Sequence, residues 1–249
     1  MLNNFDDLGG INTYSYAFGC NATTFYTDSR AQEAYRNWIK FIVDRYKKSP
    51  AIFSWELMNE PRCRTCPTSV ITNWATDISK YIKSLDPFNM VALGDEGWFA
   101  DSTYGDGRYP YSGYEGVNFL DNIKIKTLDY ATVHLYPNYW GENNAWGNDW
   151  IAQHADAGKK ANKPVVLEEY GCIENGEEAI ASCLNGWQAT ARSSGVAVDQ
   201  IWQFATELPT AGRNLFDQFA VYYNKTAGSL YDLVVLQDVK RMAKAPLLF

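Results

Sequence analysis

Two glutamates occupy positions at which catalytic carboxylates are commonly found. Glu60 comes just after the short apolar run 51–58, and Glu169 comes just after the run 164–168. Both runs read as buried strands, and α/β-barrel enzymes place their catalytic groups at the carboxyl ends of strands. A pair of carboxylates can hydrolyse a glycosidic bond, because one protonates the leaving oxygen while the other stabilises or attacks the anomeric carbon. The alternative for either glutamate alone is a salt bridge at the rim of the fold.

The elements that must position these glutamates alternate between strands and helices. We predict strands at 51–58, 90–93, 130–135, 164–168 and 199–204, and helices at 29–47, 70–85, 150–161, 177–193 and 229–243. We expect a capping box of Ser29 and Gln32 at the first helix. Strand and helix alternation predicts parallel strands in an α/β fold. The Gly- and Tyr-rich stretch 100–127 reads as a long surface loop with at most a short helix.

The number of predicted strands is lower than a closed barrel requires. A (β/α)8 TIM barrel has eight strands, and the pattern here gives five. The sequence therefore predicts either an incomplete barrel or an open sheet. No linker, repeat or low-complexity tract divides the chain, so we expect residues 1–249 to form a single domain.

Composition narrows the class of partner. The 249 residues are 46% hydrophobic, which suffices for one large core, and carry a formal charge of −7 that disfavours nucleic acid and anionic membranes. No apolar run reaches the roughly 18 residues of a membrane span, so we expect a soluble protein. Aromatic residues make up 15% of the chain. Most of them should pack in the core, but some could stack on sugar rings.

Cysteines and glycosylation sequons favour an oxidising, secretory route, although residues 1–10 do not resemble a signal peptide. Cys63 and Cys66 could be half of a zinc site, but no second ligand pair accompanies them, so we prefer a small loop disulfide and expect no metal and no cofactor. Cys172 and Cys183 are candidates for a second pair, which would leave Cys20 over. Asn21 and Asn224 begin Asn-x-Thr acceptors for glycans.

Five short motifs occur in a fixed order along the chain. They are Trp55-Glu56-Leu57-Met58-Asn59-Glu60-Pro61-Arg62, Gly94-Asp95-Glu96-Gly97, His134-Leu135-Tyr136-Pro137, Glu168-Glu169-Tyr170-Gly171 and Trp202-Gln203-Phe204. Their order resembles that of the fungal β-mannanases of glycoside hydrolase family 5, over about 3–243. A lone Asn-Glu-Pro would be weak evidence for this family, whereas five motifs in the same order are specific to it. The resemblance implies a secreted, monomeric endo-β-1,4-mannanase acting on β-mannan, with Cys63–Cys66 as a loop disulfide of that family.

The resemblance also implies roles for single residues. Glu60 matches the acid/base, and Asn59 matches the residue that bonds the 2-hydroxyl of the sugar being cleaved. Glu169 matches the nucleophile because it precedes an aromatic-Gly pair, although strand parity does not separate it from Glu168. These roles imply a retaining double displacement with carboxyl groups about 5 to 5.5 Å apart, compared with roughly 6.5 to 9.5 Å in an inverting pair.

Further residues match groups around the cleavage point. His134 and Tyr136 share one strand face and match the pair that orients the site, with Tyr136 bonding the nucleophile. Trp202 matches the platform beneath the sugar. Groups lining neighbouring sugar subsites are matched by Arg62, Glu96 and Trp140. From sequence alone, His134 could equally be a satisfied core histidine.

Other conspicuous side chains favour structural roles. We expect Glu56 to be a buried structural carboxylate and His154 to be a solvated helix residue. The helical stripes that hold Trp38, Trp74 and Trp187 favour core packing for all three.

The front of the chain departs from the family pattern. Residues 2–7 resemble the end of the third barrel strand, so we expect about the first three strands to be absent. We therefore expect the isolated chain to express poorly or to show little activity. The alternatives are a β-1,4-glucanase of the same family and a non-catalytic carbohydrate-binding fragment.

Overall fold

The computed structural model describes residues 10–101, 103–208, 212–213 and 217–244. Segment 2–7, which the resemblance assigns to a third strand, lies outside the described residues. The chain folds into two compact units. The first comprises Met1–Thr132 and Gly158–Pro164, and the second comprises Val133–Ala157 and Val165–Phe249. Within the described part, every helix is too short or too polar to cross a membrane.

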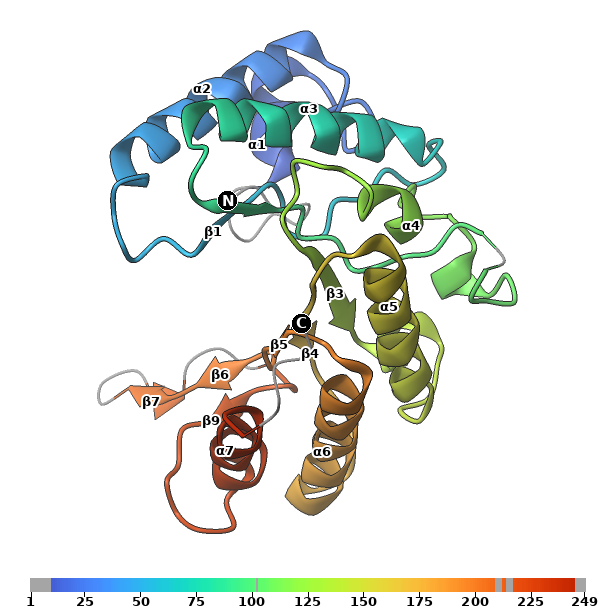
Figure 1. The fold of residues 1–249 in the computed structure, drawn as a ribbon, viewed down its shortest axis with the longest axis vertical. Coiled ribbons are helices and arrows are strands. Elements are labelled where there is room, and N and C mark those ends of the chain that lie inside the picture. The colour runs from blue at the N-terminus through green and yellow to red at the C-terminus, as the bar shows by residue number, and fades with distance from the viewer. Residues whose placement is uncertain (1–9, 102, 209–211, 214–216, 245–249) are drawn as a thin grey trace. The chain divides into compact units, whose positions relative to one another are not determined.

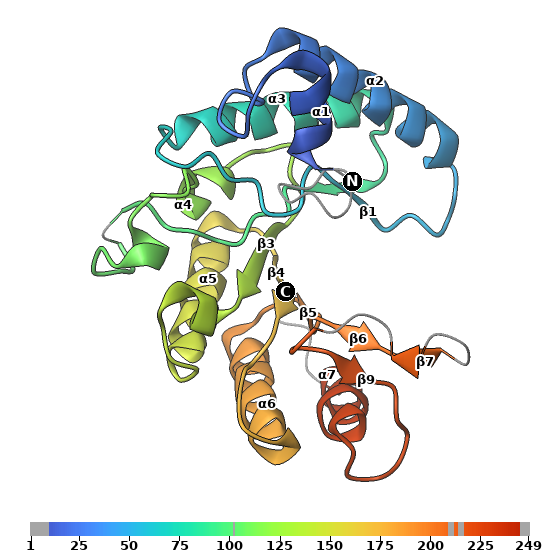
Figure 2. The same cartoon turned by 180° about the vertical axis from the view of Figure 1, so that it is seen from behind.

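The first unit is built from helices that pack beside a short parallel strand pair. Its elements in order are α1 (Ile11–Phe18), α2 (Ser29–Tyr46), β1 (Ser54–Glu56), α3 (Ser69–Leu85), β2 (Met90–Ala92), the 3-10 turn η1 (Tyr109–Tyr111) and α4 (Phe119–Asn122). Figures 1 and 2 show α2 and α3 lying side by side. Between them the Tyr35 and Trp74 rings stack with centroids 6.2 Å apart. β1 and β2 pair in parallel, with Trp55 opposite Val91.

The start of α2 differs from the prediction. Asp28 is the N-cap, and its carboxylate accepts from the backbone N–H groups of Arg30 and Ala31. The capping box of Ser29 and Gln32 is therefore wrong. Gln32 instead donates to the Phe25 carbonyl over 2.7 Å and accepts from Trp74 Nε1 over 2.9 Å. An aspartate one residue earlier offers a charged acceptor, which satisfies the first-turn N–H groups directly.

A single aspartate fixes the turn between α3 and β2. Asp86 Oδ2 accepts from Trp55 Nε1 over 2.8 Å and from Asn89 Nδ2 over 2.6 Å. Its Oδ1 accepts from the backbone N–H groups of Phe88 and Asn89, each over 3.1 Å. Burial opposes ionisation, but these hydrogen bonds outweigh it and lower the pKa of Asp86 to about 2.

The second unit centres on a three-stranded sheet in the order β3-β4-β5. Its elements in order are β3 (Ala131–Leu135), the 3-10 turn η2 (Pro137–Trp140), α5 (Trp146–Ala161), β4 (Val165–Tyr170), α6 (Glu177–Ser194), β5 (Val198–Asp199), β6 (Phe204–Ala205), β7 (Glu207–Leu208), β8 (Gly212–Arg213), β9 (Val221–Tyr222), the π-helix η3 (Asp232–Leu236) and α7 (Gln237–Met242). β6 pairs with β9 in parallel, and α6 and α7 lie side by side. Trp187 is fully buried and donates to the Asn144 carbonyl over 2.9 Å.

The predicted helices and strands are largely confirmed, but the short strands β7, β8 and β9 were not predicted, and three further differences follow. The strand predicted at 199–204 is wrong, because β5 ends at Asp199 and β6 begins at Phe204, with a cis peptide bond between Trp202 and Gln203. Helix α1 was not predicted. The stretch 100–127 is not confined to the surface, since Phe119 is 1% exposed and lies in the core.

Two predictions about single side chains are wrong. His154 is buried rather than solvated, because its Nδ1 bonds the Trp150 carbonyl of the preceding helical turn over 2.7 Å. Trp38 is 44% exposed and stacks on Phe41 rather than packing in the core. The core positions predicted for Trp74 and Trp187 are confirmed.

Candidate active site

Glu60 is held in place by a ladder that continues beyond the ends of β1 and β2. The Met58 N–H donates to the Leu93 carbonyl over 3.1 Å, and the Glu60 N–H donates to the Gly94 carbonyl over 2.9 Å. Gly94 has φ +85°, and a Cβ there would lie 2.3 Å from the Met58 carbonyl oxygen, so only glycine fits. Glu60 itself has φ 51° and is 7% exposed. Asn59 beside it is half-buried.

Arg62 lies between the Glu60 carboxylate and a second carboxylate. Its Nε and one Nη donate to the two oxygens of Glu96 over 2.7 and 2.5 Å, and the same Nη lies 3.5 Å from Glu60 Oε2. Glu96 also accepts from Trp98 Nε1 over 2.8 Å. Burial alone would lower the pKa of Arg62, but the carboxylates of Glu96, Glu60 and Glu115 raise it, so Arg62 stays charged. Arg62 and Glu96 thus lie together beside Glu60, and their role in sugar subsites stays a prediction.

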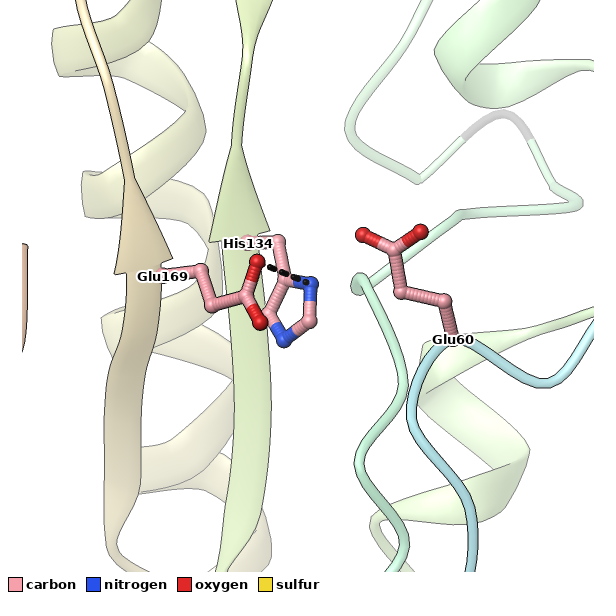
Figure 3. Close-up of side chains that lie close together, drawn as sticks. All are labelled: Glu60, His134 and Glu169. Atoms are coloured by element: carbon pink, nitrogen blue, oxygen red, sulfur yellow. Dashed lines mark ion pairs between the residues drawn. The ribbon is translucent and has the colours of Figure 1, made fainter. Parts of the chain in front are cut away.

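Glu169, near the end of β4, has the environment of an oriented carboxylate. Tyr136 donates its hydroxyl proton to Glu169 Oε2 over 2.7 Å, and His134 Nδ1 lies 3.7 Å from the same oxygen. Figure 3 shows the Glu169 carboxylate facing the imidazole of His134, and it shows the side chain of Glu60 extending from the loop after β1. The other imidazole nitrogen lies 3.5 Å from Glu168 Oε2.

These contacts distinguish two neighbouring glutamates that strand parity could not separate. Glu169 accepts the Tyr136 hydrogen bond, while the contact of Glu168 is with the other nitrogen of His134, 3.5 Å from its Oε2. His134 is fully buried, and its carbonyl accepts from Trp150 Nε1 over 2.9 Å. The imidazole is therefore a core residue and a neighbour of Glu169 at the same time.

The aromatic residues expected around the site differ in exposure. Trp202 is 39% exposed, and its Nε1 donates to Asp217 Oδ2 over 2.9 Å, which fixes the plane of an accessible indole. Trp140 is 6% exposed and packs against Tyr136 and Trp146 with ring centroids 6.4 and 6.1 Å away. Trp140 therefore supports Tyr136 from within the core and offers little surface of its own.

Both candidate cystines are present. Cys63 is bonded to Cys66, and Cys172 is bonded to Cys183, while Cys20 is a buried free thiol. The glycan acceptors Asn21 and Asn224 are both exposed, and glycosylation stays a prediction.

One residue of this region was missed from the sequence. Glu115 is 2% exposed, lies 3.8 Å from Arg62 and 3.1 Å from Arg64, and accepts a hydrogen bond from the Tyr109 hydroxyl. Burial and this bond raise the pKa of Tyr109. The sequence signals this residue only as an acidic side chain in the Gly- and Tyr-rich stretch 100–127, whose composition predicts a surface loop.

Comparison with known proteins gives a consistent result. The family model described as GH family 5 beta-mannosidase-like matches residues 10–208. The chain is 47% identical over 229 residues to mannan endo-1,4-beta-mannosidase A of Hypocrea jecorina, covering 91% of this chain and 51% of that protein. It is 43% identical over 249 residues to mannan endo-1,4-beta-mannosidase A of Podospora anserina, covering 99% of this chain and 64% of that protein.

A solved structure agrees with these sequence matches. The endo-beta-1,4-mannanase from Thermotoga petrophila superposes with a TM-score of 0.89 at 31% identity, covering 99% of this chain and 58% of that one. The chain thus spans between half and two thirds of the length of these relatives. The likeness confirms the predicted fold class, the α/β class of the (β/α)8 barrel. With the family model matching most of its residues, the chain belongs to the glycoside hydrolase family 5 β-mannosidase-like family.

Proposed function

We propose that this chain serves the endo-hydrolysis of β-1,4-mannosidic linkages in mannan, glucomannan or galactomannan. The observation that carries the proposal is the position of the Glu169 carboxylate in a chain of this family. It lies near the end of a strand, and one of its oxygens accepts a hydrogen bond from Tyr136 and lies 3.7 Å from His134. Relatives named mannan endo-1,4-beta-mannosidase and solved endo-beta-1,4-mannanases support the substrate class.

The proposed reaction is a double displacement with retained configuration. Glu60 protonates the glycosidic oxygen while Glu169 attacks the anomeric carbon, which forms a glycosyl-enzyme and releases the leaving sugar chain. Glu60, now a carboxylate, takes a proton from water, and this water displaces Glu169 from the anomeric carbon. The mechanism requires the two carboxyl groups to be about 5 to 5.5 Å apart when substrate is bound. Asn59 bonds the 2-hydroxyl and Trp202 stacks beneath the sugar.

The roles of the two glutamates can be tested in the full-length protein, restored with the N-terminal segment of a relative, by replacing each with alanine and adding azide. In Glu169→Ala, activity should fall below about a thousandth of the parent, and azide should give a product of inverted configuration, because the small anion attacks where the nucleophile stood. In Glu60→Ala, azide should give a product of retained configuration. Glu33→Ala, at an exposed glutamate of α2, is the control and should keep full activity. Full activity of Glu169→Ala would refute the assignment.

The substrate class is tested by comparing hydrolysis of mannan and cellulose. Release of reducing sugar from mannan at a rate well above that from cellulose supports the proposal. A preference for cellulose would instead make this chain a β-1,4-glucanase. Binding of mannooligosaccharide without cleavage would make it a carbohydrate-binding fragment.

We also propose that this chain supplies the later strands of the barrel and lacks about the first three. Support comes from the share of the relatives that it spans, 51% and 64% in the two named above. Adding the corresponding N-terminal segment of the Hypocrea jecorina relative should raise mannan hydrolysis at least about 100-fold. Equal activity of the chain alone would contradict this proposal.

The cellular setting is proposed to be extracellular. Two cystines and two exposed Asn-x-Thr acceptors support passage through an oxidising, glycosylating compartment. Secretion of the folded protein as a monomer carrying glycans on Asn21 or Asn224, seen as a mass loss after deglycosylation, would support it. Confinement of the unglycosylated protein inside the cell would contradict it.

A further inference from the structure

A row of alternate side chains leads from Glu60 to the surface of the first unit. Glu60 and Arg62 are 9% and 13% exposed at their side chains, and Arg64 is 57% exposed. Arg62 reaches back to Glu60, and Arg64 shares the carboxylate of Glu115 with Arg62. Arg64 therefore lies one step farther out than Arg62, which the resemblance assigns to a sugar subsite.

Arg64 is anchored at its inner end only. Its Nε donates to Glu115 Oε2 over 3.1 Å, and Glu115 is itself 1% exposed at its side chain. The two Nη groups of Arg64 make no further hydrogen bond among the described residues. A buried carboxylate thus fixes the guanidinium and leaves four N–H donors available for a ligand.

The backbone beneath Arg64 is rigidly built. The disulfide Cys63–Cys66 closes its loop, and the Cys63 and Thr65 N–H groups donate to the carbonyls of Glu115 and Tyr114 over 2.8 and 2.9 Å. Gly116 has φ +71°, and a Cβ on it would lie 2.2 Å from the Cys63 carbonyl oxygen, so this close approach of two loops requires glycine.

An exposed aromatic ring belongs to the same structure. Tyr114 is 49% exposed, and its ring centroid lies 6.3 Å from that of Tyr109, whose hydroxyl donates to Glu115. Glu115 therefore organises Arg62, Arg64 and Tyr109 at once. An accessible ring and a fixed fork of donors are the two kinds of group that bind an uncharged sugar: the ring stacks on C–H groups, and the donors bond hydroxyls.

The local charge argues against an anionic ligand. The network holds the three carboxylates of Glu60, Glu96 and Glu115 against the two guanidiniums of Arg62 and Arg64. The whole chain carries a formal charge of −7. A neutral hydroxyl-bearing ligand meets no repulsion here, whereas a phosphate or carboxylate does.

We propose that Arg64 and Tyr114, held by Glu115, form an additional sugar-binding subsite, which contacts a hexose of the β-1,4-linked chain farther from the cleavage point than the one at Arg62. This inference rests on the proposed function, because it needs a polysaccharide that runs past Glu60 and Arg62. The subsite adds affinity only for chains long enough to reach it, so Arg64 sets a preference for longer substrates.

The test measures dissociation constants of β-1,4-mannotriose to mannohexaose by calorimetry, in a Glu169→Ala background that prevents hydrolysis. The parent should bind longer chains more tightly. Arg64→Ala should weaken mannohexaose binding about five-fold, the worth of about one hydrogen bond, and leave mannotriose unchanged. Glu115→Gln should act in the same direction, since it frees the guanidinium. Arg64→Lys should rescue only part of the loss, because an ammonium lacks the fork.

Arg30→Ala is the matched control. Arg30 is 65% exposed at its side chain and pairs with Asp28 at 3.0 Å, so it resembles Arg64 in exposure and pairing. This variant should keep the parent's dependence on chain length. Equal affinity of parent and Arg64→Ala for every chain length would overturn the subsite and leave the proposed function standing. Failure of the parent to bind any mannooligosaccharide would overturn both.

Discussion

Tyr136 donates its hydroxyl proton to Glu169 Oε2 over 2.7 Å, at an oxygen that also lies 3.7 Å from His134 Nδ1. One oxygen of the carboxylate thus accepts a hydrogen bond from Tyr136 and lies close to the His134 ring, and the hydrogen bond restricts rotation about the last bond of the side chain. An attacking carboxylate benefits from such restriction, since positioning a nucleophile lowers the barrier without any new chemistry.

In the restored full-length protein, replacing Tyr136 with phenylalanine should lower kcat on mannan by about 10- to 100-fold, because Glu169 loses the bond that orients it. The free energy of unfolding should change by less than about 1.5 kcal/mol, since the ring and its packing against Phe219 remain. Steady-state kinetics and urea denaturation measure the two effects. Tyr16→Phe, at a tyrosine that is 89% exposed, serves as control. Unchanged kcat in Tyr136→Phe would remove the orienting role.

Replacing Asp86 with alanine should destabilise the first unit by about 2 to 4 kcal/mol. The change leaves the Trp55 N–H and two backbone N–H groups without their acceptor. Because the folded pKa is lowered to about 2, the carboxylate's contribution is present above the unfolded value of 3.8 and is lost as pH falls toward 2. Urea denaturation at pH 7 gives the cost. Asp77→Ala, at an exposed ion pair with Arg36, should cost less than about 1 kcal/mol.

Asp199 should make the second unit less stable as pH rises. Burial raises its pKa to about 6, Tyr170 opposes this by donating to it over 2.5 Å, and the nearby Asp238 adds to the rise. Burial raises the pKa of Asp238 above its ordinary value, and Arg192 and Arg241 oppose this rise. The folded state therefore prefers the protonated form of Asp199. Its stabilising contribution is full below the unfolded pKa of 3.8 and is lost as pH rises through about 6.

The measurement is denaturation of the parent and of Asp199→Asn at pH 4, 5, 6 and 7. The parent should lose up to about 3 kcal/mol across this range, and the variant should show a flatter profile. Asp44→Asn is the control, because the pKa of exposed Asp44 is lowered to about 2 by Lys40 and Lys47 and does not titrate in this range. Parallel profiles of parent and Asp199→Asn would contradict the prediction.

The two cystines should differ in their effect on stability. Cys172 and Cys183 are 11 residues apart, and Cys63 and Cys66 are three apart. By loop entropy, removing the longer link should cost about 3 kcal/mol and removing the shorter one about 2 kcal/mol. Thermal unfolding of the two double-serine variants tests the order. A larger loss from the Cys63 and Cys66 pair would mean that native contacts of its loop, rather than loop entropy, dominate.

The sequence predicted most helices because their apolar stripes are long, but it could not say what covers each stripe. Trp74 and Trp38 both lie on such stripes, yet Trp74 is 4% exposed and Trp38 is 44% exposed. Helix α1 was missed because Ile11 is its one buried residue in the described chain, which gives no periodic pattern. Periodicity reports a preference for burial, and only tertiary contacts decide whether it is met.

The residues of the candidate site also differ in whether a local sequence pattern can reveal them. Residues next to strand ends, such as Glu60 and Glu169, could be found from motifs because strand direction places them. Glu115 could not, because its importance comes from Arg62 and Arg64, which are about 50 residues away along the chain. His154 was misjudged since a helical histidine can bury itself by bonding a carbonyl one turn earlier. Long-range polar networks leave no local pattern.

The backbone of Glu60 has a consequence for how this chain tolerates change. A residue other than glycine with φ 51° costs free energy that glycine would not, typically about 1 kcal/mol. Glu60→Gly is therefore expected to unfold at a higher temperature than the parent while losing the proposed general acid. A library of variants selected for thermal stability alone would therefore tend to lose the Glu60 side chain. An additional screen for turnover would be needed to keep it.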